Sequence, residues 1–444
     1  MNASKGPFLG RLDWLLHRIV ASYWSLPLAG VFAALPIVLA ILWLDREGLT
    51  QWMLENGIDP VANGDTAKDL VAVSVGINAA FITLYFSLTL LVLTVASSNL
   101  GVRLVDRWLE KRLVRISLAG LSFTLIFSLV ALMAMDAEAP KEKLPLALIC
   151  AVVFLQAVNV AMLTVALHDL GRTIFVDRSI DQLGQDAAEG PFAVQSAPEE
   201  EVEWARKVCS PREGYVEGND LELLRKRLGD TGGRARICAA PGQHVLKGET
   251  LLLLERDPGD DVSDDQFLSV VPVGGFRSDG QGAVFRIRLL VEIAARALSP
   301  AVNDFYTALT SADRLGAAIL EQRHNWVNHG EIAVYCENPS FELPGQDFRG
   351  LFEDPLNALR QAACQYPSVS IRMINNYARI RQIVLEDDQS HEFAEFLRRL
   401  ARELRDHAIS VTGFDGDRDD IEAAFADGFS DPAPNSQKEA ETAS

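Results

Sequence analysis

The sequence is poor in the residues that build disulfide frameworks or zinc sites. Its 444 residues include five cysteines, which are scattered along the chain and form no Cys-x-x-Cys pair. Its seven histidines are equally dispersed, and His324 and His329, five residues apart, would not share one face of a helix. We therefore expect free, packed thiols, and neither a metal site nor a cofactor.

Charged residues are absent from four long stretches of the chain. These stretches are residues 19–44, 71–102, 116–135 and 144–167. A helix needs about 20 apolar residues to cross a bilayer core of about 30 Å, and the core helices of soluble proteins rarely run this long without charge. The sequence therefore predicts four transmembrane helices within residues 23–168, preceded by an amphipathic arm over residues 1–22. The arm lies at the membrane surface or, as the alternative, extends the first of these helices.

The distribution of basic residues predicts the orientation of the chain. They are Lys5, Arg11 and Arg18 in the arm, Arg103, Arg107, Lys111 and Arg112 in the second loop, and Arg172 and Arg178 behind the fourth stretch. The first and third loops are mainly acidic. Because basic segments stay inside, we expect both chain ends in the cytoplasm, with the protein in a bacterial inner membrane. The first apolar run is far longer than the core of a signal peptide, so no cleavage is expected.

Negative charge is concentrated in the second part of the chain. Residues 1–167 hold 12 basic and 12 acidic side chains, so the formal charge of −19 lies wholly in residues 168–444. A surface this acidic disfavours nucleic acids and anionic lipids. We therefore do not expect a nucleic-acid partner.

The four apolar stretches also lack the charged residues that proton-coupled carriers and voltage sensors usually need at membrane depth. They contain neutral polar residues instead, among them Asn78 and Thr83 in the second stretch. In the fourth, Gln156 and Asn159 are three residues apart and share a helix face. One interpretation is hydrogen bonding between helices, at about 0.6–2 kcal/mol per contact. The other is a polar lining of a pore, and the first is the more common use of such residues.

Residues 212–275 have the pattern of a small β module. Short alternating segments are separated by glycine turns. Gly242, Val245 and Gly248 resemble the Gly-x-x-Val-x-x-Gly pattern of biotinyl/lipoyl-like barrel-sandwich domains. The modifiable lysine of those domains is missing, so the resemblance implies a barrel-sandwich-like module without a prosthetic group. An ordinary hairpin is the alternative.

Helices are expected around this module, which makes the second part of the chain an α+β domain. A helical neck is predicted over residues 169–211, a helical cytoplasmic domain over 276–414, and an acidic, partly disordered tail over 415–444. The tail begins with "DGDRDD", which is not a calcium loop, because Asp420 stands where such a loop needs glycine.

The stretch "RALSPAVNDFYTAL" predicts a break between two helices. Ser299 precedes Pro300 and is pushed out of helical geometry, so the first helix ends there. Asn303 or Asp304 can then cap the amides of a second helix over residues 305–322. Local chemistry alone therefore predicts a helix, a tight loop and a helix.

The helix before this break is amphipathic. Over residues 283–298, Arg288, Glu292 and Arg296 form a ladder with i, i+4 spacing along one face. A charge ladder of this kind is sufficient to explain Glu292 as a structural residue.

The same block carries a family resemblance. "RLLVEIAARALSPAVNDFYTALTSADRLGAAI" resembles the signature of the 2254 domain-of-unknown-function family of predicted bacterial membrane proteins, which reads much like "QLVEIAxRALSPxxNDPFTA". Phe305 stands where that pattern has proline, and Tyr306 where it has phenylalanine. The resemblance covers nearly the whole chain. It implies an N-terminal membrane domain with a cytoplasmic C-terminal domain, and no established activity.

Three functional hypotheses follow. The first is an oligomeric pore or transport-like protein with a regulatory cytoplasmic domain. The second is a membrane-anchored scaffold or sensor that binds a cytoplasmic protein. The third is an enzyme using Glu292, Asn303 and Asp304, which is disfavoured because no nucleophile–base pair, phosphate-binding loop or metal set accompanies them. The expected partners are the lipid bilayer, further copies of the chain and, under the second hypothesis, a cytoplasmic protein.

Overall fold

The structure is a computed structural model of the chain. It describes residues 24–58, 60–100, 112–173, 176–189, 193–229, 232–259, 262–277, 281–387 and 390–430. These residues fall into two compact units that divide between Phe175 and Val176. We call them the membrane unit and the polar unit. The amphipathic arm predicted over residues 1–22 and the end of the predicted tail, from residue 431, lie outside the described residues.

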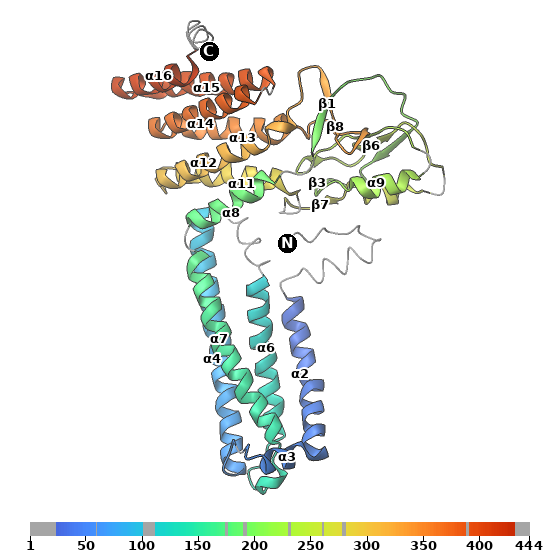
Figure 1. Cartoon of the computed structure of the whole chain (residues 1–444), viewed down its shortest axis with the longest axis vertical. Helices are drawn as coiled ribbons and strands as arrows, with labels where there is room; N and C mark the ends of the chain where they lie inside the picture. The colour runs from blue at the N-terminus through green and yellow to red at the C-terminus, as the bar shows by residue number, and fades with distance from the viewer. Residues whose placement is uncertain are drawn as a thin grey trace, which may run out of the picture. The chain divides into compact units, whose positions relative to one another are not determined.

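The membrane unit contains four long helices, which are labelled in Figure 1. They are α2 (Ser25–Leu44), α4 (Gly64–Leu100), α6 (Arg112–Met133) and α7 (Leu146–Thr173). All four are long and apolar enough to cross a membrane, which confirms the prediction of four such helices. Helix α4 has 37 residues and is about 55 Å long, so it exceeds the thickness of a bilayer core. Short elements join α2 to α4 and α6 to α7. They are η1 (Asp45–Leu49), α3 (Thr50–Glu55) and η2 (Lys141–Lys143).

Helix α6 is the centre of this bundle, because it packs against α2, α4 and α7. The approach of α2 is close: a Cβ atom on Gly30 would stand 3.0 Å from the carbonyl oxygen of Ala119. Large apolar side chains such as Phe32 and Phe154 are exposed on the outside of the bundle. Apolar side chains therefore lie both inside and outside, and close packing with buried polar contacts must hold the helices together.

The polar unit has a helical part in which the helices stack in layers (Figure 1). Its helices are α8 (Val176–Ala188), α11 (Ala283–Ala297), α12 (Phe305–Glu321), α13 (Phe348–Ala363), α14 (Pro367–Glu386), α15 (His391–Val411) and α16 (Asp415–Phe429), with the short η5 (Arg323–Asn325). Helix α11 packs against α8, α12 and α13, and α14 packs against α12, α15 and α16. The regular spacing of apolar residues on each helix explains this stacking.

The rest of the polar unit contains two sheets. The larger has six strands in the order β1 (Val194–Pro198), β8 (Glu331–Tyr335), β9 (Asn338–Glu342), β4 (Ala235–Ile237), β6 (Thr250–Leu254) and β2 (Arg206–Cys209). All its neighbouring strands are antiparallel except β4 and β9, which are parallel. The smaller has the order β5 (His244–Val245), β3 (Gly214–Val216) and β7 (Val273–Gly274), all antiparallel.

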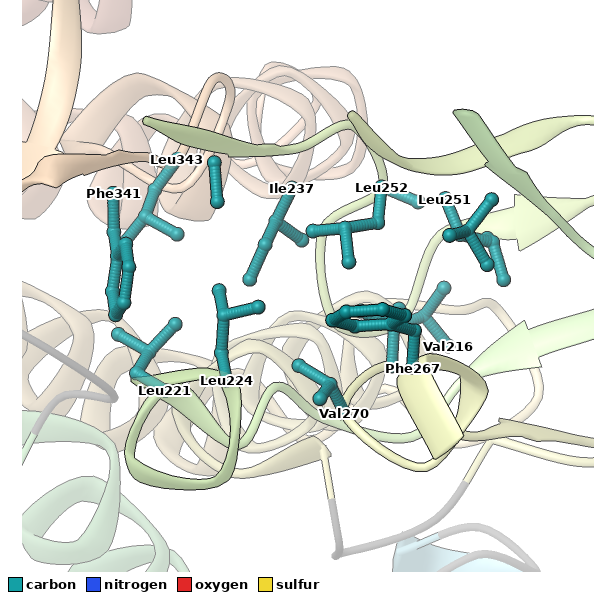
Figure 2. Close-up of a cluster of buried hydrophobic side chains, with 14 of the residues drawn as sticks. Val216, Leu221, Leu224, Ile237, Leu251, Leu252, Phe267, Val270, Phe341 and Leu343 are labelled. Atoms are coloured by element: carbon teal, nitrogen blue, oxygen red, sulfur yellow. The ribbon is translucent and has the colours of Figure 1, made fainter. Parts of the chain in front are cut away.

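One apolar core lies between the larger sheet and the segments opposite it. Those segments include the helices α9 (Leu221–Leu228) and α10 (Asp264–Leu268). Figure 2 shows Ile237 and Leu252 of the larger sheet pointing toward Leu224 and Phe267. Val216 of the smaller sheet belongs to the same buried cluster. Each such side chain contributes about 1.5–3 kcal/mol when fully buried, so both sheets depend on this core.

Three details of the sequence-based prediction are wrong. The described strands do not close into a barrel, so the barrel-sandwich detail is not supported. The helix of the predicted neck ends at Ala188 and is followed by β1 and β2. The predicted helical domain contains β8 and β9, which complete the larger sheet. The physical reason is that these strands are stabilised by pairing with distant segments, and local periodicity does not record such pairing.

The glycine turns predicted for the β module are present in the structure. Gly242 and Gly248 have φ values of +78° and +87°, on either side of the two-residue strand β5. Val245 between them is fully buried. The Gly-x-x-Val-x-x-Gly pattern therefore predicts the turns and the buried valine, but not the sheets to which they belong.

Candidate functional site

The predicted corner between two helices is present, and its bonds are local. Helix α11 ends at Ala297, and the hydroxyl of Ser299 donates to the carbonyl oxygen of Arg296 at 2.6 Å. Asp304 is the N-cap of α12: its carboxylate accepts from the backbone N–H of Thr307 at 3.2 Å and from its hydroxyl at 2.6 Å. The helix stop and the helix cap are thus confirmed, with Asp304 rather than Asn303 as the cap.

Asn303 has a different role in this corner. Its φ is +49°, in the left-handed region that asparagine tolerates better than most residues other than glycine. Its backbone N–H donates to the carbonyl oxygen of Ser299 at 2.9 Å, while that of Asp304 donates to Ala297 at 2.8 Å. Asn303 therefore turns the chain from Pro300 into α12.

The charged residues of the corner form a loose surface pair. The guanidinium of Arg296 lies 3.8 Å from the carboxylate of Glu292, one turn apart on α11, and both side chains are about one-third exposed. Exposed pairs of this type contribute about 0.3–0.5 kcal/mol. The six candidate residues of the corner therefore have structural positions, and none of them lines the cleft described below.

Only some of the polar residues predicted to lie within the membrane contact one another. Asn78 of α4, Ser128 of α6 and Asn159 of α7 are buried. The side-chain amide of Asn159 donates to the Asn78 oxygen at 3.1 Å, and the Asn78 amide donates to the Ser128 hydroxyl oxygen at 3.4 Å. Thr83 is exposed on the outside of α4, where its hydroxyl donates to the carbonyl oxygen of Ala79. The residues Asn78, Ser128 and Asn159 form a bonded set, which we call the amide triad.

Apolar side chains surround the amide triad. One buried apolar cluster includes Val71 and Phe127, and another includes Tyr85 and Leu121. In each helix these residues lie about two turns or less from the triad. The triad thus occupies an isolated position between apolar layers of the bundle, as expected for hydrogen bonds that hold helices together.

Gln156 does not join the triad. In the part of the membrane unit that the structure describes, its buried Nε2 and Oε1 atoms have no hydrogen-bond partner. A polar group without a partner in an apolar surrounding is costly, by about 1–3 kcal/mol. Gln156 is therefore the polar side chain of this unit whose presence packing explains least.

A buried carboxylate in the membrane unit was missed by sequence reasoning. Asp45 accepts from the backbone N–H of Ala147 at 3.1 Å, from that of Leu148 at 3.2 Å and from the hydroxyl of Thr50 at 2.9 Å. It therefore caps the start of α7, where the helix dipole favours negative charge. Its partners lie about a hundred residues away, so no local pattern could reveal this contact.

The polar unit contains a cleft of about 360 Å³. Its lining comes from the turn before β5, the segment after β7, the first turns of α11, and the start of α13. The charged or titratable residues of the lining are His244, Arg277, Arg288 and Asp354. Clefts of roughly 300–1,000 Å³ are typical of small-molecule sites.

Gly242 allows the turn to approach α11 closely. A Cβ atom at this position would lie 3.2 Å from Val284, 3.3 Å from the Arg288 guanidinium and 3.4 Å from the Gln281 side-chain oxygen. The carbonyl oxygen of Gly242 accepts from Arg288 at 3.2 Å, which holds that guanidinium at the cleft wall. The positive φ of Gly242 also suits glycine best.

A buried glutamine amide lies in the wall of this cleft. Gln346 lines it and is 5% exposed; its oxygen accepts from the amide of Asn219 at 2.6 Å, while its Nε2 has no partner among the described residues. A buried N–H without an acceptor costs about 1–3 kcal/mol, so this group is suited to a bound acceptor.

The two helices that begin at the cleft differ in their caps. The N-cap of α11 is Gly282, which has no side chain to accept from the first amides. The N-cap of α13 is Asp347, whose carboxylate accepts from the backbone N–H of Gly350 at 3.3 Å. Burial raises the pKa of Asp347 above its ordinary value of 3.8, and the backbone hydrogen bonds and Arg349 oppose this shift. The partial positive charge at the start of α11 is therefore less neutralised than the one at the start of α13.

Aromatic rings position the basic groups on the other wall. The guanidinium of Arg277 lies 5.0 Å from the ring centre of Tyr215, within the range of cation–π contacts. The rings of Tyr215 and His244 meet edge to face, with centres 5.0 Å apart. Sequence reasoning missed this site because its residues are spread from Gly242 to Asp354, and only the Gly242 turn gave a local signal.

The described residues contain no group of three His, Cys, Asp or Glu side chains that could hold a metal ion. Residues 20–379 match the model of a family described as "Predicted membrane protein (DUF2254)". The chain is 27% identical over 362 residues to uncharacterized proteins of Mycobacterium bovis and Mycobacterium tuberculosis, covering 75% of this chain and 68% of each relative. No solved structure matches it.

Proposed function

Because the chain belongs to the DUF2254 family of predicted membrane proteins, we propose that it is a membrane-anchored sensor. In this proposal the membrane unit is the anchor, and the polar unit binds a small polar ligand in the cleft beside Gly242. The observation that carries the proposal is the cleft itself: about 360 Å³ in volume, with the buried Nε2 of Gln346 in its wall, which has no partner among the described residues. The proposal assigns no chemical reaction to the protein.

The bundle supports the role of an anchor. Its amide triad bonds α4, α6 and α7 to one another between apolar layers, and its outer surface is apolar. A polar path through one copy of the bundle would have to pass the buried side chains of Tyr85, Leu121 and Phe127. The excess of basic residues near the membrane boundaries supports a cytoplasmic position for the polar unit in a bacterial inner membrane.

A pore or transport-like function is the second candidate, and one observation favours it. The amide of Gln156, which has no partner among the described residues, lies in a helix long and apolar enough to cross a membrane, where water or a polar solute would satisfy it. Such a function would need several copies of the chain to enclose a path. Flux of ions and small osmolytes through reconstituted liposomes above that of empty liposomes, and its loss in Gln156→Leu, would support this candidate. Equal flux would remove it.

Hydrogen–deuterium exchange tests the sensor proposal directly. The full chain in nanodiscs is compared with and without the small-molecule fraction of a bacterial lysate. We expect slower exchange in three of the four wall segments, 240–244, 281–288 and 345–354, because a bound ligand stabilises the state that binds it. Helix α15 does not line the cleft and is the internal control. Unchanged exchange in all three wall segments would refute the proposal.

A further inference from the structure

The cleft has an electrostatic character opposite to that of the polar unit. Residues 168–444 carry the whole formal charge of −19. The cleft nevertheless has two guanidinium groups in its wall, from Arg277 and Arg288, against one carboxylate, from Asp354. A local excess of positive charge inside an acidic protein raises the local concentration of anions.

The uncharged donors at the cleft favour an anion as well. The Nε2 group of Gln346, in the cleft wall, is buried and lacks an acceptor among the described residues. Gln281 immediately precedes Gly282, whose lack of a side chain leaves the first amides of α11 without a side-chain cap. A helix start whose first amides lack a side-chain cap, and which carries the positive end of the helix dipole, is a favourable place for a phosphate group.

From this arrangement we infer that the ligand of the cleft carries a phosphate group, held by Arg277, Arg288 and the buried amide of Gln346. This inference rests on the proposed function and adds the chemical class of the ligand. A phosphate offers three acceptor oxygens, enough for two guanidinium groups and an amide at once, whereas a carboxylate offers two. Arg288 already donates to the carbonyl oxygen of Gly242, and a guanidinium has further N–H groups for a ligand.

Asp354 narrows the chemical class of the ligand further. A carboxylate in the wall repels a bare anion but accepts a hydrogen bond from a hydroxyl group. A phosphate monoester with free hydroxyl groups therefore matches the cleft better than inorganic phosphate does. Both share the phosphate group, so both bind, and the ester binds more tightly.

Thermal unfolding of the full chain in detergent micelles tests the inference. Its melting temperature is measured by tryptophan fluorescence during titration with glycerol 3-phosphate, inorganic phosphate and glycerol, at constant ionic strength. A ligand that binds only the folded state raises the melting temperature as its concentration rises. We expect a saturating rise with glycerol 3-phosphate, a rise at higher concentration with inorganic phosphate, and no rise with glycerol at the same concentrations.

Matched charge substitutions test whether the rise in melting temperature comes from binding in the cleft. Gln346→Glu places a carboxylate where the amide donates, and we expect it to weaken phosphate binding about tenfold or more, since hydrogen bonds to charged groups are worth about 1.5–3 kcal/mol. Gln365→Glu makes the same change on an exposed residue outside the cleft and is expected to bind as the wild type does. Arg277→Gln, with the exposed Arg379→Gln as its control, repeats the test in case Gln346→Glu does not fold.

The results of the melting and exchange experiments distinguish a failure of the phosphate assignment from a failure of the sensor proposal. Equal shifts in the wild type and both cleft variants would mean nonspecific stabilisation and would overturn the phosphate assignment. So would a shift with glycerol equal to that with its phosphate. If the lysate fraction protects the cleft from exchange while neither phosphate probe raises the melting temperature, the ligand class is wrong and the sensor proposal stands. If neither experiment responds, both proposals fail.

Discussion

Replacing Asn78 by leucine should weaken the membrane unit, because it removes both hydrogen bonds of the amide triad. In the wild type, Asn78 accepts from Asn159 at 3.1 Å and donates to Ser128 at 3.4 Å. All three side chains are buried, so water does not replace the lost partner. The substitution leaves the Asn159 amide without its acceptor, whereas the smaller hydroxyl of Ser128 loses only a long contact.

The expected magnitude follows from these contacts. A hydrogen bond between membrane helices contributes about 0.6 kcal/mol on average and up to about 1.7 kcal/mol. An unpartnered buried group adds a cost of about 1–3 kcal/mol. We therefore expect Asn78→Leu to lower the free energy of unfolding by about 1–3 kcal/mol. Asn159→Leu should do the same, and the double variant should lose less than the sum, with a coupling energy of about 0.6–1.7 kcal/mol.

Reversible unfolding in mixed micelles measures this double-mutant cycle. The fraction folded is followed by circular dichroism as the mole fraction of sodium dodecyl sulfate rises. Thr83→Val is the control, because Thr83 is exposed on the same helix and bonds only within it, so its effect should stay within about 0.5 kcal/mol. Strictly additive effects of Asn78→Leu and Asn159→Leu, or a control as large as either, would refute the role given to the triad.

Three further predictions concern the polar unit. Asp304→Ala removes a helix cap and should lower the free energy of unfolding by about 0.5–2 kcal/mol, measured by thermal melting; an unchanged melting temperature would contradict the capping role. Asn303→Val puts a β-branched residue at positive φ and should cost about 1–2 kcal/mol, whereas Asn303→Gly should be nearly neutral; equal effects of the two would remove the backbone argument. Burial raises the folded-state pKa of Asp347 above 3.8, so the folded state binds this proton more tightly than the unfolded state does. The wild type therefore loses stability as the pH rises from 3.8 through that raised pKa, and Asp347→Asn should gain melting temperature relative to the wild type over that interval. Parallel pH profiles of the two proteins would contradict this assignment.

Local chemistry predicted the parts of the structure that depend on neighbouring residues. The four apolar stretches give four helices that are long and apolar enough to cross a membrane, because length and absence of charge are sufficient to recognise them. The break at Pro300 and the cap at Asp304 follow from steric restriction and from one carboxylate near the first amides of α12. The buried Val245 between two glycine turns is likewise predicted by the local pattern of residues.

Distant pairing explains what the sequence did not reveal. Strand β1 pairs with β8, more than a hundred residues later, so its segment has no local pattern that distinguishes a strand from a connection. The cap of α7 by Asp45 depends on a contact of the same sequence separation. The cleft combines Gly242 with Gln346, and it forms only because the smaller sheet and two helices meet there. The residues of that site could be named only once the fold was known.

An experimental structure of the full chain in nanodiscs, determined by electron cryomicroscopy at saturating glycerol 3-phosphate, would show whether the cleft beside Gly242 binds a phosphate-bearing molecule. We expect density for a phosphate group within hydrogen-bonding distance of Arg277, Arg288 and Gln346, and loss of that density in Gln346→Glu. An empty cleft in the wild type, or the same density in both proteins, would contradict this expectation.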